Sequence, residues 1–205
     1  MHREVLPGGW EQAAGDLAAR DAIQGFYLAG GTGLALQFGH RRSRDLDLFS
    51  HEEFHPVDLN TRLRGLPGLK VHQALRGTLH VELHGVLVSF LHYPYPLLFP
   101  LLQFERLPVA DHRDIAGMKL NAIASRGSRR DFVDLYVAAR QYGLRDILAW
   151  FETKHAASPY NRVHVLKALT FFADAEQQPM PDMLVSGIDW NTVKQFFLSQ
   201  APRLL

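Results

Sequence analysis

The chain has 205 residues, of which 47% are hydrophobic and 21% charged, which excludes a disordered, collagen-like or coiled-coil protein and predicts one large or two small domains. It contains no cysteine, which excludes a disulfide scaffold, a thiolate zinc site and a cysteine nucleophile. Its 22 Lys and Arg balance 21 Asp and Glu, so the overall charge does not favour binding to nucleic acid. Whether the chain binds nucleic acid therefore depends on local clusters of charge.

Two segments of the chain bear on targeting and on membrane insertion. Residues 1–16 contain no apolar core of the kind that a signal peptide needs. The longest apolar stretch, residues 97–102, is interrupted by Pro100 and is too short to span a bilayer. We therefore expect a soluble, cytoplasmic protein that does not enter a membrane.

The first half of the chain is expected to mix helices and strands. Apolar residues at helical spacing predict a helix over residues 10–17, and the apolar run 26–29 predicts a short strand. A short helix is expected over residues 34–38, ended by Gly39, because glycine is the usual residue just past a helix.

Strand patterns follow. Residues 45–48 alternate Asp and Leu, which predicts a strand with both carboxylates on one face. Further strands are expected over residues 69–74, 79–83 and 86–91, and a tight turn at His84-Gly85 joins the last two as a hairpin. The last of these is apolar at nearly every position, which is typical of a central strand.

Beyond Pro108 the apolar period becomes helical. Stripes of apolar residues predict helices over residues 115–123, 132–139 and 144–151. A further helix is expected to begin at Pro159 with Ser158 as its cap, and a last one to be capped by Asp189. We place a boundary at residue 108, between an α/β lobe over residues 1–108 and a helical lobe over residues 109–205.

One constellation carries chemistry: Gly30-Gly31-Thr32 followed by Asp45 and Asp47. The glycines let a phosphate approach the backbone, and the start of a helix offers free N–H groups to it. The two carboxylates lie two strand steps apart, about 7 Å at Cα, so their oxygens can converge on a hard cation. Mg²⁺ binds through one or two carboxylates together with substrate phosphates.

The basic run His40-Arg41-Arg42-Ser43-Arg44 lies between these two halves, where the charge of a triphosphate would be neutralised. Two commoner phosphate-binding motifs are absent. No Lys-Ser/Thr pair follows the glycines, so the segment is not a P-loop, and Leu36 stands where a dinucleotide fold requires its third glycine. The alternative is a tight turn followed by a solvated edge strand.

Residues 29–50, AGGTGLALQFGHRRSRDLDLFS, resemble the signature of the AbiEii/AbiGii-type nucleotidyltransferase toxins, within the polymerase-beta-like nucleotidyltransferase superfamily. Residues 114–136 resemble that family's second block, and residues 170–181 a segment of its short members. The resemblance covers nearly the whole chain. It implies an α+β fold, with a nucleotidyltransferase lobe of mixed sheet and flanking helices and a C-terminal helical lobe.

The resemblance also implies roles for single residues. Those implied to bind the nucleotide are Gly30, Gly31, Thr32, Ser43, Arg44 and Lys119. Asp45 and Asp47 would be catalytic and hold Mg²⁺ or Mn²⁺, Lys119 would contact the triphosphate, and Asp131 corresponds to a functionally important acid. The spacing of Asp131 and Asp134 places both on one helix face, which agrees with this assignment.

The superfamily usually has a third carboxylate on a later strand, which helps to activate the attacking hydroxyl. Glu82 is the only strand acid available here, and Ser89 stands where an acid is expected. We interpret Glu82 as a candidate base or third ligand, the alternative being a residue that faces solvent. His80 and His84, on either side of it, are expected to be structural or solvated.

The string His51-Glu52-Glu53-Phe54-His55 matches the H-E-x-x-H zinc motif letter for letter. That chemistry requires the motif inside a helix, so that both imidazoles share one face. Pro56 follows at once, and Ser50 with Glu53 forms a capping box instead. We therefore do not expect a zinc hydrolase.

These observations predict Mg²⁺-dependent transfer of a nucleotidyl group from a nucleoside triphosphate to an acceptor hydroxyl. By resemblance, the acceptor is an RNA 3′ end such as that of tRNA, or a protein, and the chain is the toxin of a bacterial toxin–antitoxin pair with a cognate antitoxin. One alternative is a catalytically inactive nucleotide- or RNA-binding module, which Ser89 favours. Another is an antitoxin-binding scaffold without chemistry.

Overall fold

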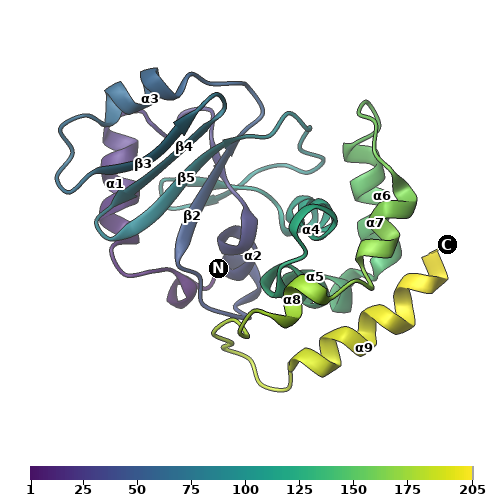
Figure 1. The fold of residues 1–205 in the computed structure, drawn as a ribbon. Coiled ribbons are helices and arrows are strands. Elements are labelled where there is room, and N and C mark those ends of the chain that lie inside the picture. The colour runs from purple at the N-terminus through teal and green to yellow at the C-terminus, as the bar shows by residue number, and fades with distance from the viewer. Residues whose placement is uncertain (205) are drawn as a thin grey trace.

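The computed structural model describes residues 1–204, and its centre is one mixed sheet of seven strands (Figure 1). In space the strands run in the order β3-β4-β5-β2-β1-β7-β6. Their bounds are β1 (Tyr27–Leu28), β2 (Asp45–Ser50), β3 (Lys70–Leu75), β4 (Thr78–Leu83), β5 (Val86–His92), β6 (Leu102–Phe104) and β7 (Leu107–Val109). Strand β2 is parallel to β5, β1 is parallel to β7, and the other neighbours are antiparallel.

The helices form two groups (Figure 1). The first half of the chain contributes α1 (Trp10–Ala19), α2 (Gly30–Phe38) and α3 (Pro56–Leu63). The second half contributes α4 (His112–Arg126), α5 (Arg129–Tyr142), α6 (Leu144–Lys154), α7 (Arg162–Ala168), α8 (Ala173–Glu176) and α9 (Trp190–Gln200). Single 3₁₀ turns lie at Arg3–Val5 and Ala201–Leu204. Within residues 1–204, no helix combines the length and apolar character needed to cross a membrane.

One face of the sheet is buried and the other is open beside the helical group. Alternate residues of β2, β4 and β5 pack with α1 and α3 into one apolar cluster, which includes Leu46, Leu48, Val88 and Phe90. The intervening residues of β2 face the other way and are half-buried, as the alternation of Asp and Leu predicts. The open face is therefore the one that presents Asp45 and Asp47.

The predicted strands and hairpin are confirmed, with one refinement. His84 and Gly85 both have positive φ, 52° and 77°, as a tight two-residue turn requires. Strand β5 lies between β4 and β2, as its apolar composition predicts. It is buried on one face only, however, because Leu87 is 49% exposed on the open face.

The predicted helices are confirmed, but two of them begin elsewhere than expected. Helix α2, expected over residues 34–38, already begins at Gly30, so the glycines form its first turn. Gly39 ends α2 with φ 66°, and Asp189 caps α9 by accepting a hydrogen bond from the Thr192 N–H at 2.7 Å. The helix expected to begin at Pro159 begins instead at Arg162. Asn161 is its cap, since its side chain accepts from the His164 N–H at 3.0 Å, whereas the Ser158 N–H closes the turn after α6.

The H-E-x-x-H string lies in a loop, which supports the decision against a zinc hydrolase. Helix α3 begins only at Pro56, so His51 and His55 do not share a helix face. The capping box expected at Ser50 is wrong. Ser50 is the last residue of β2, and its hydroxyl donates to the Glu52 carbonyl rather than capping a helix.

Several contacts join the halves of the chain, two of them through apolar packing and backbone hydrogen bonds. A small apolar cluster links β1 and α2 to α4 through Tyr27, Leu34, Ile115 and Met118. A segment before α9 also pairs with the loop after α2: the Arg42 N–H donates to the Asp182 carbonyl at 2.8 Å, and the Leu184 N–H to the His40 carbonyl at 2.9 Å. We propose to keep the division at residue 108, although Pro108 itself lies within β7.

Candidate active site

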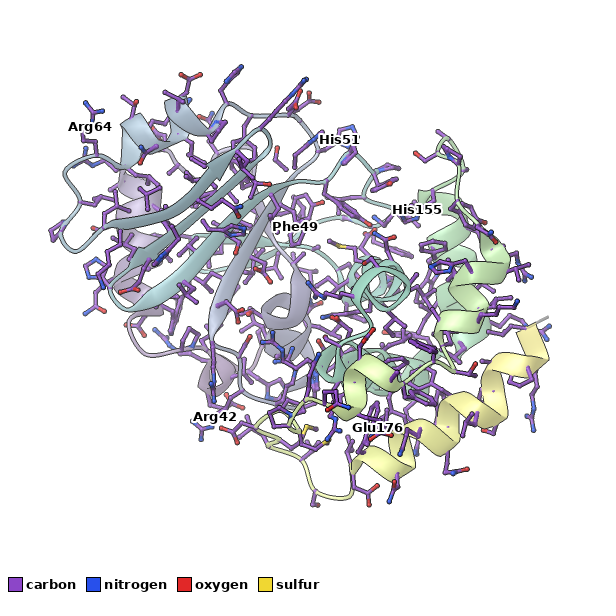
Figure 2. All side chains as sticks on the ribbon, in the orientation of Figure 1. Arg42, Phe49, His51, Arg64, His155 and Glu176 are labelled. Atoms are coloured by element: carbon purple, nitrogen blue, oxygen red, sulfur yellow. The ribbon has the colours of Figure 1, made fainter. Side chains whose placement is uncertain are left out.

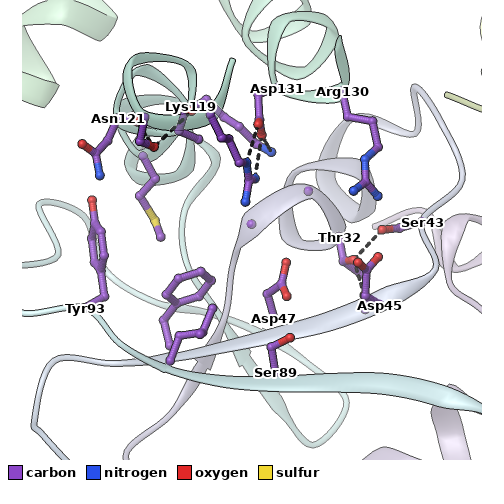
Figure 3. Close-up of a pocket in the computed structure, with 18 of the residues that line it drawn as sticks. Thr32, Ser43, Asp45, Asp47, Ser89, Tyr93, Lys119, Asn121, Arg130 and Asp131 are labelled. Atoms are coloured by element: carbon purple, nitrogen blue, oxygen red, sulfur yellow. Dashed lines mark hydrogen bonds and ion pairs between the residues drawn. The ribbon is translucent and has the colours of Figure 1, made fainter. Parts of the chain in front are cut away.

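A cavity of about 490 Å³ lies between the open face of the sheet and helix α4 (Figure 3). Strands β2 and β5 form its floor, the start of α2 one wall, and α4 and α5 its roof. It contains most of the residues to which the sequence assigns a role: Gly30, Gly31, Thr32, Ser43, Asp45, Asp47, Lys119 and Asp131. Segments far apart in the chain therefore converge on one site.

The start of α2 is built to bring its backbone close to the carboxylates. Gly30 has φ 60°, and a Cβ there would lie 2.7 Å from Asp47 Oδ2, so only glycine fits without strain. The Thr32 hydroxyl lies 2.5 Å from Ser43 Oγ and donates to the Asp45 carbonyl, which ties α2 to the beginning of β2. The first N–H groups of a helix lack intrahelical partners and are suited to bind an anion.

Asp45 and Asp47 are the two carboxylates on the floor of the cavity. They lie on one face of β2, opposite Leu87 and Ser89 of β5. Burial, and then the charge of Asp45, raise the pKa of Asp47, while Lys119 and a hydrogen bond with Ser89 act in the opposite direction. In the described part of the chain, neither carboxylate forms an ion pair. Two hard oxygen ligands with uncompensated charge fit a divalent cation such as Mg²⁺.

Lys119 is held in a buried network of ion pairs. Its Nζ lies 2.9 Å from Asp131 Oδ1 and 2.7 Å from Asp134 Oδ2. Burial alone would lower the pKa of Lys119, but the two carboxylates outweigh it and raise the pKa. Asp134 is fully buried and also accepts from Arg41 Nε at 2.7 Å and from His40 Nε2 at 2.8 Å. Lys119 is therefore a cation at the roof whose charge is already balanced.

Asp131 is also shared between cations. Besides Lys119, it accepts from Arg126 Nε at 2.8 Å and from the Ser128 hydroxyl at 2.5 Å. Although burial acts to raise it, the pKa of Asp131 falls well below its usual range because of Lys119 and Arg126. Arg126 is 66% exposed at the mouth of the cavity. Asp131 is thus an ionised residue that positions two cations.

Arg130 and Arg44 occupy different places. Arg130 points into the cavity toward Thr32 and Ser43 (Figure 3), and no residue of the described chain forms an ion pair with it. Arg44 lies outside the main cavity, in a neighbouring hollow of about 390 Å³ that also includes Arg42, Arg130 and residues 178–182. Figure 2 shows Arg42, a residue of this hollow, at the outer edge of the molecule.

Glu82 does not join the carboxylate pair. It lies on β4 opposite Leu87, two strands from Asp45 and therefore about 10 Å away at Cα. Its carboxylate instead pairs with Lys70 Nζ at 2.7 Å, which lowers the pKa of Glu82. The strand acid that the sequence offers as a third ligand thus lies outside the cavity.

His80 is a cavity residue that sequence reasoning missed. Its Nδ1 lies 3.0 Å from the Ser89 hydroxyl, beside Asp47. The signal was present in the hairpin: counting back from the turn at His84-Gly85 places His80 opposite Ser89. The imidazole therefore stands next to the position where a third carboxylate was expected.

The other end of the cavity is apolar. Phe49 continues the face of Asp45 and Asp47 along β2, and Figure 2 places it near the centre of the molecule, between β2 and α4. Its ring lies 5.8 Å from that of Tyr93, and Figure 3 shows Tyr93 and Asn121 at this end, away from Asp45. Met118 completes the wall. Flat apolar walls with a neighbouring amide suit a nucleobase.

Comparisons with known proteins agree with this architecture. Residues 14–80 and 87–203 match the family described as "Nucleotidyl transferase AbiEii toxin, Type IV TA system". An uncharacterised protein of Aquifex aeolicus (strain VF5) is 34% identical over 178 residues, which cover 84% of each chain.

Two solved structures have a similar fold. MenT4, a nucleotidyltransferase toxin of Mycobacterium tuberculosis, superposes with a TM-score of 0.55 and 16% identity, over 92% of this chain and 82% of its own. JHP933 of Helicobacter pylori has a TM-score of 0.52 and 16% identity, over 95% and 89%. At this level of identity these two structures establish the fold, and the α+β class predicted from the sequence is confirmed.

Proposed function

Since the chain belongs to the family of AbiEii nucleotidyl transferase toxins, we propose that it transfers a nucleotidyl group from a nucleoside triphosphate to an acceptor hydroxyl, with Mg²⁺ or Mn²⁺ as cofactor. One observation carries this proposal. Asp45 and Asp47 face a cavity that the start of α2 also lines, and neither has an ion-pair partner within residues 1–204. This places hard anionic ligands beside a group of anion-binding N–H donors.

The roles of the chain's own groups follow from their positions. Asp45 and Asp47 would hold the metal, which when bound supplies Lewis-acid stabilisation of phosphate oxygens. The N–H groups of Gly31 and Thr32 bind the triphosphate at the start of α2, and Arg130 adds a charge there. In the reaction the acceptor oxygen bonds to the α-phosphorus and the bond to pyrophosphate breaks.

Lys119 contributes to the electrostatic potential in the cavity together with its two carboxylate partners, and not as an unpaired charge. Asp131 and Asp134 keep its ammonium at the roof of the cavity, within the set of residues that faces Asp47. The nucleobase lies at the apolar end, between Phe49 and Met118, where Asn121 is the nearest side-chain amide.

The acceptor we propose is RNA. Arg42, Arg44 and Arg130 line a hollow that shares Arg130 and Ser43 with the catalytic cavity, and Asp182 is the acidic residue among them. A chain of phosphates suits such a row of guanidinium groups, because each forms charge-assisted hydrogen bonds with phosphate oxygens. The proposed acceptor group is an RNA 3′ end such as that of tRNA. A cognate antitoxin would inhibit the protein in the cell, and the reaction would take place in the cytoplasm.

The direct test is labelling of total RNA and of protein by each α-labelled triphosphate in the presence of Mg²⁺. We expect wild type to label RNA, and Asp45→Asn and Asp47→Asn to lose at least a hundred-fold of that activity, since each removes one metal ligand. Asp58→Asn, an exposed carboxylate on α3, is the matched control and retains activity. Equal labelling by Asp45→Asn and wild type contradicts the proposal.

A second function, nucleotide or RNA binding without turnover, is favoured by Ser89 at the position of the third carboxylate. Calorimetry with the same triphosphates separates the two. Binding of a triphosphate with Mg²⁺ by wild type, without labelling of any acceptor under Mg²⁺ or Mn²⁺, would support this second function.

A further inference from the structure

His80 lies where the catalytic cavity meets a second hollow. This hollow, of about 490 Å³, covers the open face of β3, β4 and β5, and it shares Asp45, His80 and Ser89 with the catalytic cavity. A substrate that crosses the open face of the sheet would therefore reach the carboxylate pair past the imidazole of His80.

The hydrogen bond to Ser89 leaves one nitrogen of His80 for a substrate. Nδ1 lies 3.0 Å from Ser89 Oγ, whereas Nε2 forms no hydrogen bond with the described residues. In the tautomer in which Nδ1 carries the proton and donates it to Ser89 Oγ, Nε2 has the free lone pair.

The acidic side chains near the site have other roles or partners. Glu82 is paired with Lys70 outside the cavity, and Asp131 is shared between Lys119 and Arg126. Asp45 and Asp47 are the candidate metal ligands. The charged or titratable groups that face the surroundings of His80 are Asp45 and Asp47 of β2, His72 of β3, and Lys119 and Arg126 of α4.

We propose that His80 is the general base of the reaction. This inference rests on the proposed nucleotidyl transfer. As the acceptor oxygen bonds to the α-phosphorus and pyrophosphate leaves, the proton of the acceptor hydroxyl passes to His80 Nε2. Water in the open hollow then takes that proton and restores the imidazole.

The test is the pH dependence of kcat for wild type and His80→Gln, at saturating triphosphate and acceptor. For wild type we expect kcat to fall on the acidic side, because a protonated imidazole accepts no proton. His80→Gln should lose about 100-fold in kcat and also lose this acidic limb, while KM for the triphosphate stays within two-fold. His51→Gln, an exposed histidine in the loop after β2, is the matched control and keeps the wild-type profile.

A second variant distinguishes a base from a merely structural residue. His80→Ala leaves space beside Ser89, so imidazole added to the buffer should restore at least a tenth of the lost rate in His80→Ala and none in Asp45→Asn. The proposal is overturned if His80→Gln retains kcat within two-fold of wild type, or if wild type and His80→Gln show the same pH dependence of kcat. A wild type that labels no acceptor contradicts the proposed function instead.

Discussion

The buried carboxylate of Asp134 offers the sharpest test of how the two halves of the chain are held together. It accepts from three side chains: His40 at 2.8 Å, Arg41 through both of its oxygens at 2.7 and 2.8 Å, and Lys119 at 2.7 Å. Asp134→Asn keeps the shape of the side chain and removes its charge. Lys119 and Arg41 then lose their common anion inside the protein.

The expected cost follows from this geometry. Breaking a buried ion pair by removing one partner destabilises a protein by about 3–5 kcal/mol, because an uncompensated charge stays behind. The asparagine still offers one oxygen as an acceptor, so we expect the lower end, about 3 kcal/mol in the free energy of unfolding. For a chain of this size that corresponds to a fall in Tm of about 6–12 °C.

Urea unfolding at neutral pH measures the effect, and Asp146→Asn on α6 is the matched control because its carboxylate is exposed. The pH dependence is a second readout. The cations of the network hold the pKa of Asp134 well below its ordinary value against the opposing effect of burial. A lowered pKa stabilises the fold at neutral pH, and this contribution disappears as pH falls below the ordinary carboxyl range.

Wild type should therefore lose stability in acid more steeply than Asp134→Asn does, and the difference between them should shrink. A loss below about 1 kcal/mol at neutral pH, equal to that of Asp146→Asn, would refute the reasoning, since changes of that size are ordinary for exposed sites.

Two further predictions concern the cavity. Gly30→Ala places a Cβ 2.7 Å from Asp47 Oδ2 at a positive φ, so transferase activity should fall at least ten-fold. The control is Gly25→Ala, which has φ 79° and nothing within 4 Å of the added Cβ, and it should keep its activity. Equal activity of the two variants would contradict the steric argument. Combined Arg42→Ala and Arg44→Ala should raise KM for RNA by more than ten-fold and reduce the salt slope by about 1 for each arginine. An effect on KM for the triphosphate alone would assign the hollow to the nucleotide instead.

Local patterns in the chain predicted most of the elements and the face of β2 that carries Asp45 and Asp47. The alternation in Asp45-Leu46-Asp47-Leu48 suffices to place both carboxylates on one face, because a strand repeats every two residues whatever surrounds it. The start of α7 was predicted wrongly because two residues close together in the chain could each cap a helix. Ser158 and Asn161 are both good helix caps, and only the turn after α6 selects Asn161.

The family was also evident from the sequence, through two blocks that bring a glycine turn, a carboxylate pair and a lysine into one chain. Their resemblance predicted the α+β fold, which the solved structures confirm. The roles of the single residues in those blocks stay predictions, to be decided by the variants proposed above.

The sequence by itself determined most of the elements, the face that carries Asp45 and Asp47, and the family, but it did not indicate β6, β7 or α8. Only the tertiary structure decided which partners surround them: it pairs Lys119 with two buried carboxylates, brings His80 beside Ser89, and leaves Glu82 with Lys70 outside the cavity. The physical reason is the distance along the chain between the residues that interact. Strand and helix periods act between neighbours in the chain, whereas the ion pair of Arg41 and Asp134 joins residues 93 positions apart, and such pairs form only when the whole fold brings them together.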